Sequence, residues 1–230
     1  REIAELKNDN EFIYKKFRKF YNKFNHVHCP SNMIAEQLRE HGYTANLHVI
    51  SNGVSDVFKK IEVAKPEHLK DKFVILMIGR YSVEKRQDLI IKAVQESKYE
   101  KNIQIILAGK GPWKNHLESL GQSLTNKPIF GFYNEKELID VINYSDLYVH
   151  ASDAEIEAIS CMEAFTCGLV PIISDSKLSA TNQFALDDTN LFKAGNYQSL
   201  KEKIEFYIEN PEKKAIRSKE YIEYSKQYSL

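Results

Sequence analysis

The hydrophobic residues of this chain fall into short uninterrupted runs that are separated by amphipathic stretches. The runs are FVILMIG (73–79), IQIILAG (103–109), PIFGF (128–132), DLYVHAS (146–152) and LVPIIS (169–174). Runs that are apolar throughout predict strands buried on both faces, and the stretches between them predict helices. Helices are expected at about 86–97, 113–124 and 135–145, from about Ala158 to Gly168, and from about Ser199 onward. This alternation predicts an α/β fold, a doubly wound Rossmann-like parallel sheet with helices on both faces.

Residues 1–50 do not follow this rhythm. They predict a polar and aromatic helix over 1–25, a short run HVHCPS (26–31), a helix at 32–41, and LHVISNGV (47–54). A single strand between helices cannot bury both faces, so we expect HVHCPS to lie at the edge of a sheet that this chain lacks. The turn signal Asn52-Gly53 predicts the boundary. We therefore expect three parts: 1–52, the end of an incomplete N-terminal domain and linker; 53–210, the Rossmann-like domain; and 211–230, a C-terminal helix.

Composition narrows the possible partners. The chain has 32 basic and 32 acidic residues, so no global field favours nucleic acid as a partner. No apolar run approaches the ~20 residues of a membrane-spanning helix. No signal peptide is evident, and the first residue is Arg1, which suggests a piece of a longer cytoplasmic protein. Cys29, Cys161 and Cys167 form no CxxC pair, so we expect reduced core thiols and no metal site.

Two loops that follow predicted strands contain residues suited to binding an anion. Ligands of open α/β sheets gather beyond the carboxyl ends of the strands. Arg80 and Lys85 bracket the turn after the first run, which suits a phosphate group or simply solvated surface charge. After the second run, Gly109-Lys110-Gly111-Pro112 suits close backbone approach to an anion or a plain strand-to-helix turn.

The third loop is ASDAEIEAISCMEA (151–164), which contains three glutamates. Ser152 with Glu155, and Ser160 with Glu163, both match the spacing of a capping box at a helix start. A helix that starts near Ala158 places Glu163 one turn beyond Ile159 and leaves Glu155 in a loop above the sheet. A carboxylate on the inner side of a buried helix needs a hydrogen-bonded partner, for which the adjacent hydroxyls of a ribose are suitable. His150, at the end of the preceding strand, lies close to the same predicted cleft.

The order of these motifs resembles the GT-B glycosyltransferases of the large retaining group called family 4. The family pattern S-x-x-E-G-F-G-L-x-x-x-E-A-x-x-x-G corresponds to S-D-A-E-I-E-A-I-S-C-M-E-A-F-T-C-G, residues 152–168. The glutamates have the same spacing, with seven residues between them. SNGV (51–54), GRYSVEK (79–85), GKGP (109–112) and FGF (130–132) extend the resemblance over essentially the whole chain.

The resemblance implies a donor-binding half with a role for each motif. It implies that Arg80 and Lys85 bind the diphosphate of a nucleotide sugar, and that Glu163 binds the ribose hydroxyls. It implies that Glu155 approaches the donor sugar, making Glu155, Arg80 and Lys85 the catalytic group. The remaining donor-binding positions would be Gly111, the backbone around Phe132 at the base, and the amides of Ile159 and Ser160 at the distal phosphate. Such sites usually need neither metal nor other cofactor, since cations and the helix dipole offset the leaving-group charge.

This sequence departs from the family pattern after the first glutamate. Ile156 and Ala158 replace glycines, and Glu157 stands between them, so added Cβ atoms narrow the loop and Glu157 is either a helix-start charge or a branch-specific contact. EIEAI together with LSATNQFALD (178–187) resembles the bacterial lipid-directed branch, cholesterol α-glucosyltransferases and diacylglycerol glucosyltransferases. That resemblance implies UDP-glucose as donor and a membrane lipid as acceptor, bound through the missing N-terminal domain.

Other interpretations remain open at this stage. A capsule or lipopolysaccharide glycosyltransferase would differ only in its acceptor, and a sugar-nucleotide epimerase would share the two-domain fold. A non-catalytic nucleotide-binding module would use Glu155 and Glu163 only as helix caps. YKKFRKFYNKF (14–24) mixes basic and aromatic residues, which suits an anionic membrane surface at the inner face of the plasma membrane or packing against the missing domain.

Overall fold

A six-stranded parallel sheet forms the centre of the larger part of the molecule. The computed structural model describes residues 12–230, and residues 1–11 lie outside the described range. The strands follow the order β10-β8-β6-β3-β4-β5. They are β3 (Phe73–Ile78), β4 (Ile103–Ala108), β5 (Ile129–Gly131), β6 (Leu147–His150), β8 (Pro171–Ser174) and β10 (Leu191–Phe192). The predicted doubly wound fold is confirmed.

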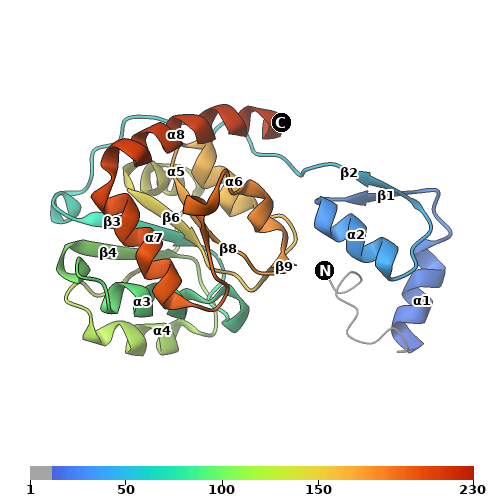
Figure 1. Ribbon diagram of the computed structural model, residues 1–230, viewed down its shortest axis with the longest axis horizontal. Coiled ribbons are helices and arrows are strands. Elements are labelled where there is room, and N and C mark those ends of the chain that lie inside the picture. The colour runs from blue at the N-terminus through green and yellow to red at the C-terminus, as the bar shows by residue number, and fades with distance from the viewer. Residues whose placement is uncertain (1–11) are drawn as a thin grey trace.

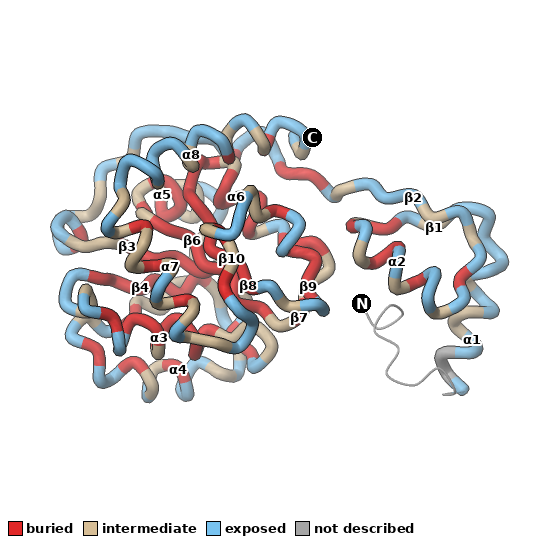
Figure 2. The backbone as a smooth tube through the Cα atoms, viewed as in Figure 1, coloured by how far each residue is buried: buried red, intermediate tan, exposed pale blue. Residues whose placement is uncertain are grey.

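Helices cover both faces of this sheet (Figure 1). They are α3 (Gln87–Gln95), α4 (Lys114–Leu120), α5 (Glu135–Tyr144), α6 (Ile159–Thr166), α7 (Tyr197–Glu209) and α8 (Pro211–Ser225). Helices α3, α4 and α7 lie together on one face, α5 and α6 lie on the other, and α8 packs on α6. Strands β3 and β4 are buried through most of their length because both faces are covered (Figure 2). Short 3₁₀ helices η1 to η7 occupy Glu67–Leu69, Val83–Lys85, Glu100–Asn102, Gly121–Ser123, Ala180–Phe184, Asp188–Asn190 and Lys226–Tyr228.

Residues 12–49 form a smaller unit of their own. It contains α1 (Phe12–Tyr21), β1 (His26–Cys29), α2 (Asn32–Glu40) and β2 (Asn46–Val49). HVHCPS was expected at the edge of a sheet that this chain lacks; in the structure it pairs, as β1, in parallel with β2, from His26 opposite Asn46 to Cys29 opposite Val49, a pairing that was not predicted. A small apolar cluster stabilises the unit: Cys29, Ile34, Ala35, Leu38 and Tyr43.

The C-terminal residues return to the linker between the two units. Val54 and Ser229 form a parallel β-bridge. The Val54 amide donates to the Tyr228 carbonyl at 2.8 Å, and the Leu230 amide donates to the Val54 carbonyl at 3.2 Å. A Cβ atom on Gly53 would lie 2.4 Å from Leu230 Cδ2, so the turn signal Asn52-Gly53 coincides with a tightly packed crossing.

Two further sequence expectations can be compared with the structure. The three cysteines are free and buried, which confirms the prediction of reduced core thiols. Glu155 does not lie in an irregular loop, because β7 (Ala154–Glu155) pairs in parallel with β9 (Leu178–Ser179). Within residues 12–230, no helix combines the length and apolar character that crossing a membrane requires.

Candidate active site

The largest of the described cavities lies at the carboxyl ends of β3, β4 and β5. It has a volume of about 530 Å³. It is lined by Ile78, Gly79, Arg80, Ala108, Gly109, Lys110, Gly111, Pro112, Phe132, Tyr133 and Leu138. The chain connects β3, β4 and β5 in one direction and β6, β8 and β10 in the other, so the winding reverses between β3 and β6. Ligands of open α/β sheets bind beside such a reversal.

Glycines allow the first two loops around the cavity to touch. A Cβ atom on Gly111 would lie 2.3 Å from the Tyr81 carbonyl oxygen, and one on Gly109 would lie 2.1 Å from that of Gly79. The Tyr81 hydroxyl donates to the Leu107 carbonyl at 2.7 Å, which anchors the first loop on β4. At the cavity, Lys110 Nζ lies 4.4 Å from the ring centroid of Phe132, whose side chain is 68% exposed. The glycines of GKGP therefore allow the loop after β4 to lie directly against the backbone of the loop after β3.

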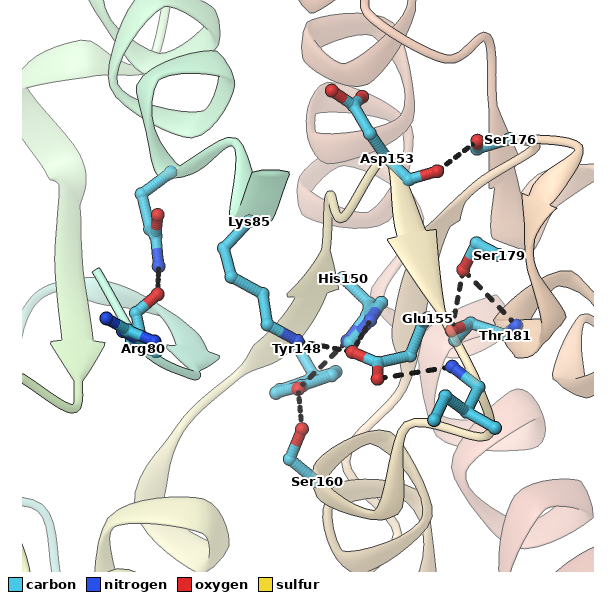
Figure 3. A network of polar contacts seen from close by, with 12 residues as sticks. Arg80, Lys85, Tyr148, His150, Asp153, Glu155, Ser160, Ser176, Ser179 and Thr181 are labelled. Atoms are coloured by element: carbon cyan, nitrogen blue, oxygen red, sulfur yellow. Dashed lines mark hydrogen bonds and ion pairs between the residues drawn. The ribbon is translucent and has the colours of Figure 1, made fainter. Parts of the chain in front are cut away.

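Ion pairs join the loop after β3 to the loop after β6. Lys85 in η2 binds the Glu155 carboxylate of β7 (Figure 3). Arg86, which adopts a left-handed conformation with φ 56°, contacts Asp153 at 3.2 Å. The Asp153 amide donates to the Glu84 carbonyl at 2.8 Å. Arg80 is exposed, and its guanidinium has no recorded ion pair among the described residues. The two loops are thus one connected surface.

The Glu155 carboxylate is strongly held in its ionised form. Burial alone would raise the pKa of Glu155, but the neighbouring His150 and Lys85 outweigh burial and lower that pKa to about 2. His150 is 1% exposed, and its Nε2 lies 3.7 Å from Glu155 Oε2. Burial lowers the pKa of His150, the Lys85 charge lowers it further, and the Glu155 contact opposes both. The imidazole is therefore neutral beside an ionised carboxylate.

The start of α6 supplies free amides to the same region. Ala158 precedes α6 in a left-handed conformation, φ 62° and ψ 63°, which a glycine adopts more easily. The amides of Ile159 and Ser160 have no recorded acceptor among the described residues, as is usual for the first turn of a helix. The Tyr148 hydroxyl donates to Ser160 Oγ at 3.1 Å. This helix start can donate hydrogen bonds to an anion.

Glu163 lies on α6 in an environment opposite to that of Glu155. Burial raises the pKa of the Glu163 carboxyl, and the negative charge of Glu135 at the start of α5 raises it further. Among the described residues, no hydrogen bond or ion pair to the Glu163 side chain is recorded. The carboxylate is therefore available to a hydroxyl-bearing ligand.

The residues that depart from the family pattern face the smaller unit. Ile156 packs against its apolar cluster, and the Ile156 carbonyl accepts a hydrogen bond from Ser31 Oγ at 2.9 Å. Glu157 is 3% exposed, and its carboxylate accepts hydrogen bonds from the Asn52 amide, at 3.0 and 3.2 Å, and from Asn52 Nδ2. Glu157 thus makes a contact within the chain, and whether this contact is specific to one branch of the family stays a prediction.

Comparison with known proteins assigns the family. Residues 58–227 match the family model described as "Glycosyl transferases group 1", and residues 4–57 match "Glycosyltransferase Family 4". The chain belongs to the glycosyl transferases group 1 family. The catalytic domain of cholesterol-alpha-glucosyltransferase from Helicobacter pylori is 45% identical, with a TM-score of 0.66, over 68% of this chain and 98% of that chain.

Other members of this set are more distant. Alpha-monoglucosyldiacylglycerol synthase of Streptococcus pneumoniae is 26% identical in an alignment of 172 residues that covers 68% of this chain but only 38% of the synthase. The crystal structure of Anabaena Alr3699/HepE in complex with UDP and glucose has a TM-score of 0.81 at 21% identity, over 93% of this chain and 62% of that one. The last similarity shows the fold alone. The chain is related to glucosyltransferases whose names specify lipid acceptors.

The structure places the predicted site residues in two neighbouring groups. Arg80, Gly111 and Phe132 line the cavity. The remaining five, Lys85, Glu155, Ile159, Ser160 and Glu163, lie in η2, β7 and the first turns of α6. The loop 80–85 connects the two groups: Arg80 at its start lines the cavity, and Lys85 at its end pairs with Glu155.

Several residues of this site were not predicted from the sequence. It did not identify the Arg86–Asp153 pair, which joins the two loops, or Tyr148, which contacts Ser160. The proximity of His150 was predicted, but its contact with Glu155 was not. An unusual signal for Tyr148 and His150 was available, since both are polar residues inside the apolar run DLYVHAS.

Proposed function

We propose that this chain is the donor-binding part of a retaining glycosyltransferase that transfers a hexose, glucose from UDP-glucose, to a membrane lipid. The observation that supports this most is the arrangement of Arg80, the free α6 amides, the ionised Glu155 and the unpartnered Glu163 around one strand-end region. Cations and helix amides suit a diphosphate, and a carboxylate without a partner suits ribose hydroxyls.

The glucosyl group and the lipid acceptor are supported by the relatives. Both the Helicobacter pylori and the Streptococcus pneumoniae proteins are named as alpha-glucosyl enzymes, one for cholesterol and one for diacylglycerol. An alpha product from a nucleotide sugar is consistent with retention. The uridine base rests on the resemblance to family 4 and is the part that direct measurement decides first.

The mechanism assigns each charged side chain a role at the leaving group. Arg80 and the amides of Ile159 and Ser160 would hold the diphosphate as negative charge develops on it. Lys85, which pairs with Glu155 in this structure, has three ammonium donors that suit a phosphate oxygen. The proposal assigns charge neutralisation to these groups and requires no metal. Removal of Arg80 should weaken transition-state stabilisation by about 3 kcal/mol in the complete enzyme.

Acceptor activation is assigned to the part of the protein that this chain lacks. The chain spans about 38% of the length of the Streptococcus pneumoniae synthase. We therefore expect the 230-residue chain to bind donor nucleotide without transferring sugar. Transfer to lipid by this chain alone would contradict that expectation.

Calorimetric titration with UDP tests the proposed function. The wild-type chain should bind UDP with a dissociation constant of about 0.1–1 mM, which is roughly 4–5 kcal/mol. Glu163→Gln should weaken binding at least about tenfold, because the amide replaces one of the two charged acceptor oxygens of the carboxylate by an NH2 donor. Glu67→Gln is the matched control, since Glu67 is exposed in η1, before β3.

Each outcome of the titration has a distinct meaning. UDP binding that is lost in Glu163→Gln and retained in Glu67→Gln supports a donor-binding domain. Tighter binding of GDP than of UDP changes the donor to a GDP-sugar. Binding that is unaffected by Glu163→Gln favours a non-catalytic nucleotide-binding module, in which Glu163 does not contact the nucleotide. Absence of binding to either nucleotide contradicts the proposal for this chain.

A further inference from the structure

His150 has one ring nitrogen without a hydrogen-bond partner in a fully buried position. Among the described residues, Nε2 of His150 makes no hydrogen bond. Such an atom is costly to bury and requires an explanation. The nearest charged oxygen is Glu155 Oε2 at 3.7 Å, too far for a direct hydrogen bond but close enough to interact with a proton on Nε2.

The other ring nitrogen of His150 also faces an acceptor. His150 Nδ1 lies 3.4 Å from the Tyr148 hydroxyl, and this hydroxyl donates its own proton to Ser160 Oγ. The Tyr148 oxygen is then an acceptor facing Nδ1, and the Glu155 carboxylate is an acceptor facing Nε2. A neutral His150 carries one ring proton and cannot donate to both acceptors, whereas an imidazolium can. Figure 3 shows this row of side chains from Lys85 through Glu155 and His150 to Tyr148 and Ser160.

Lys85 determines whether this arrangement is stable. Its ammonium pairs with Glu155, and its positive charge disfavours a second cation on His150. The other titratable groups beside the ring are Glu155 of β7 and Tyr148 of β6, and Cys161 of α6 lies near these two groups. Burial raises the pKa of both Tyr148 and Cys161, so these two groups are neutral.

A bound diphosphate would change the balance of charge around His150. Under the proposed function, the diphosphate lies between Lys85 and the start of α6, so it attracts the Lys85 ammonium and adds negative charge near the ring. Both effects favour the imidazolium form. We propose that His150 takes up one proton from solvent when the donor diphosphate binds, and then donates Nε2–H to Glu155 in place of Lys85.

In this role His150 is a positioning residue, because it acts on the donor through Glu155. The protonated ring keeps the Glu155 carboxylate oriented while Lys85 contacts phosphate. Through Tyr148 it also reaches Ser160, whose amide faces the distal phosphate in the proposed mode of binding. One row of hydrogen-bonded side chains would then connect the sugar end and the phosphate end of the donor site. This inference rests on the proposed function.

Proton-linked calorimetry tests the inference directly. UDP is titrated into the 230-residue chain in three buffers of different ionisation enthalpy, none of them phosphate, near pH 7. The slope of observed enthalpy against buffer enthalpy gives the number of protons taken up. Wild type should take up a substantial fraction of one proton more than His150→Gln, which retains a donor near the Nε2 position but does not titrate. His68→Asn, at an exposed histidine in η1, should match wild type.

Comparison of variants removes the titration of UDP itself. The terminal phosphate of UDP has the same effect in each protein, so only the difference in slope is assigned to His150. His150→Asn should bind UDP about tenfold more weakly than wild type, and His150→Gln should recover most of that loss. A merely structural role for His150 would change affinity without changing proton uptake.

Measurement on the wild-type protein avoids dependence on variants that fail to fold. Histidine ring NMR of the seven histidines, with and without UDP, should show one ring whose pKa rises on binding. UDP binding with equal proton uptake in wild type and His150→Gln, or with no ring whose pKa rises, would overturn the inference while leaving the proposed function intact. Absence of UDP binding would overturn both.

Discussion

Glu155 and Glu163 lie eight positions apart in the chain and occupy opposite electrostatic environments. Glu155 has Lys85 and His150 beside it, and its pKa is lowered to about 2. Glu163 has no recorded partner among the described residues, and burial together with Glu135 raises its pKa. Burial disfavours ionisation of both carboxyls, so the difference comes from the neighbours. The two glutamates of the motif therefore differ in how strongly their surroundings favour the ionised form.

The comparison predicts that Glu155 stabilises the fold and that Glu163 does not. Ionisation of Glu155 stabilises the folded chain, because its cation is already in place. Ionisation of Glu163 costs stability, and residues that are unfavourable for the fold are frequent at binding sites. The following predictions test this distinction, beginning with the largest expected effect.

Glu155→Gln should lower the free energy of unfolding by about 3 kcal/mol near pH 7, the equivalent of a pKa lowered from 4.5 to about 2. The folded pKa is the lower one, so the advantage of Glu155 exists above pH 4.5 and is lost as pH falls towards 2. Urea unfolding of both proteins at several pH values measures the difference. An equal difference at neutral and acidic pH would show that charge is not its origin.

Glu157→Gln should lower the free energy of unfolding by about 2 kcal/mol, because a second amide opposes Asn52 Nδ2 in a buried position. The double variant Asn52→Asp with Glu157→Gln restores a donor opposite an acceptor and should recover at least half of the loss. Urea unfolding of the four proteins gives the coupling. Additive losses would mean that the Asn52 contact contributes little.

Ala158→Gly should raise the free energy of unfolding by about 1 kcal/mol, because glycine adopts the left-handed conformation without strain. Ala215→Gly is the matched control within the regular helix α8, where the same change should destabilise by about 1 kcal/mol. Thermal or urea unfolding distinguishes the two signs. Destabilisation by Ala158→Gly would show that the packing of the Ala158 methyl group outweighs backbone strain.

Glu163→Gln should have the smallest effect on stability, a gain under about 1 kcal/mol near neutral pH. The folded pKa of Glu163 is raised, so the wild-type chain loses stability as pH rises above 4.5 and the variant does not. The gain should therefore grow with pH, opposite to the trend for Glu155→Gln. A loss of stability that grows with pH would show a hidden cation partner.

The fold was largely predictable because its strands are strongly apolar. FVILMIG and IQIILAG became β3 and β4 within one residue at the carboxyl end. The segment 178–192 was harder, since β9 and β10 contain two residues each and lack periodicity. The parallel pair β1 and β2 was missed because strand pairing is a long-range choice that neither HVHCPS nor LHV specifies by itself.

The site could be predicted as a set of positions but not as a set of pairs. Spacing and resemblance located Lys85 and Glu155 separately, whereas their ion pair joins residues 70 positions apart. The contacts of Ile156 with Ser31 and of Glu157 with Asn52, in the other unit and its linker, were not predicted. Local sequence cannot show which part of the molecule these two side chains face. The assignment of donor-binding roles to the eight site residues stays a prediction.

The crossing at Asn52 to Val54 has a mechanical consequence for the molecule. Glu157 holds the linker from the side of α6, and the C-terminal residues hold it through the Val54–Ser229 bridge. Because this segment is held from both sides, we expect any rotation of the smaller unit to take place about residues 52–54. Ile156, which precedes α6 in the chain, packs against the core of the smaller unit. Rotation of the smaller unit would then displace the segment that leads into the first turn of α6.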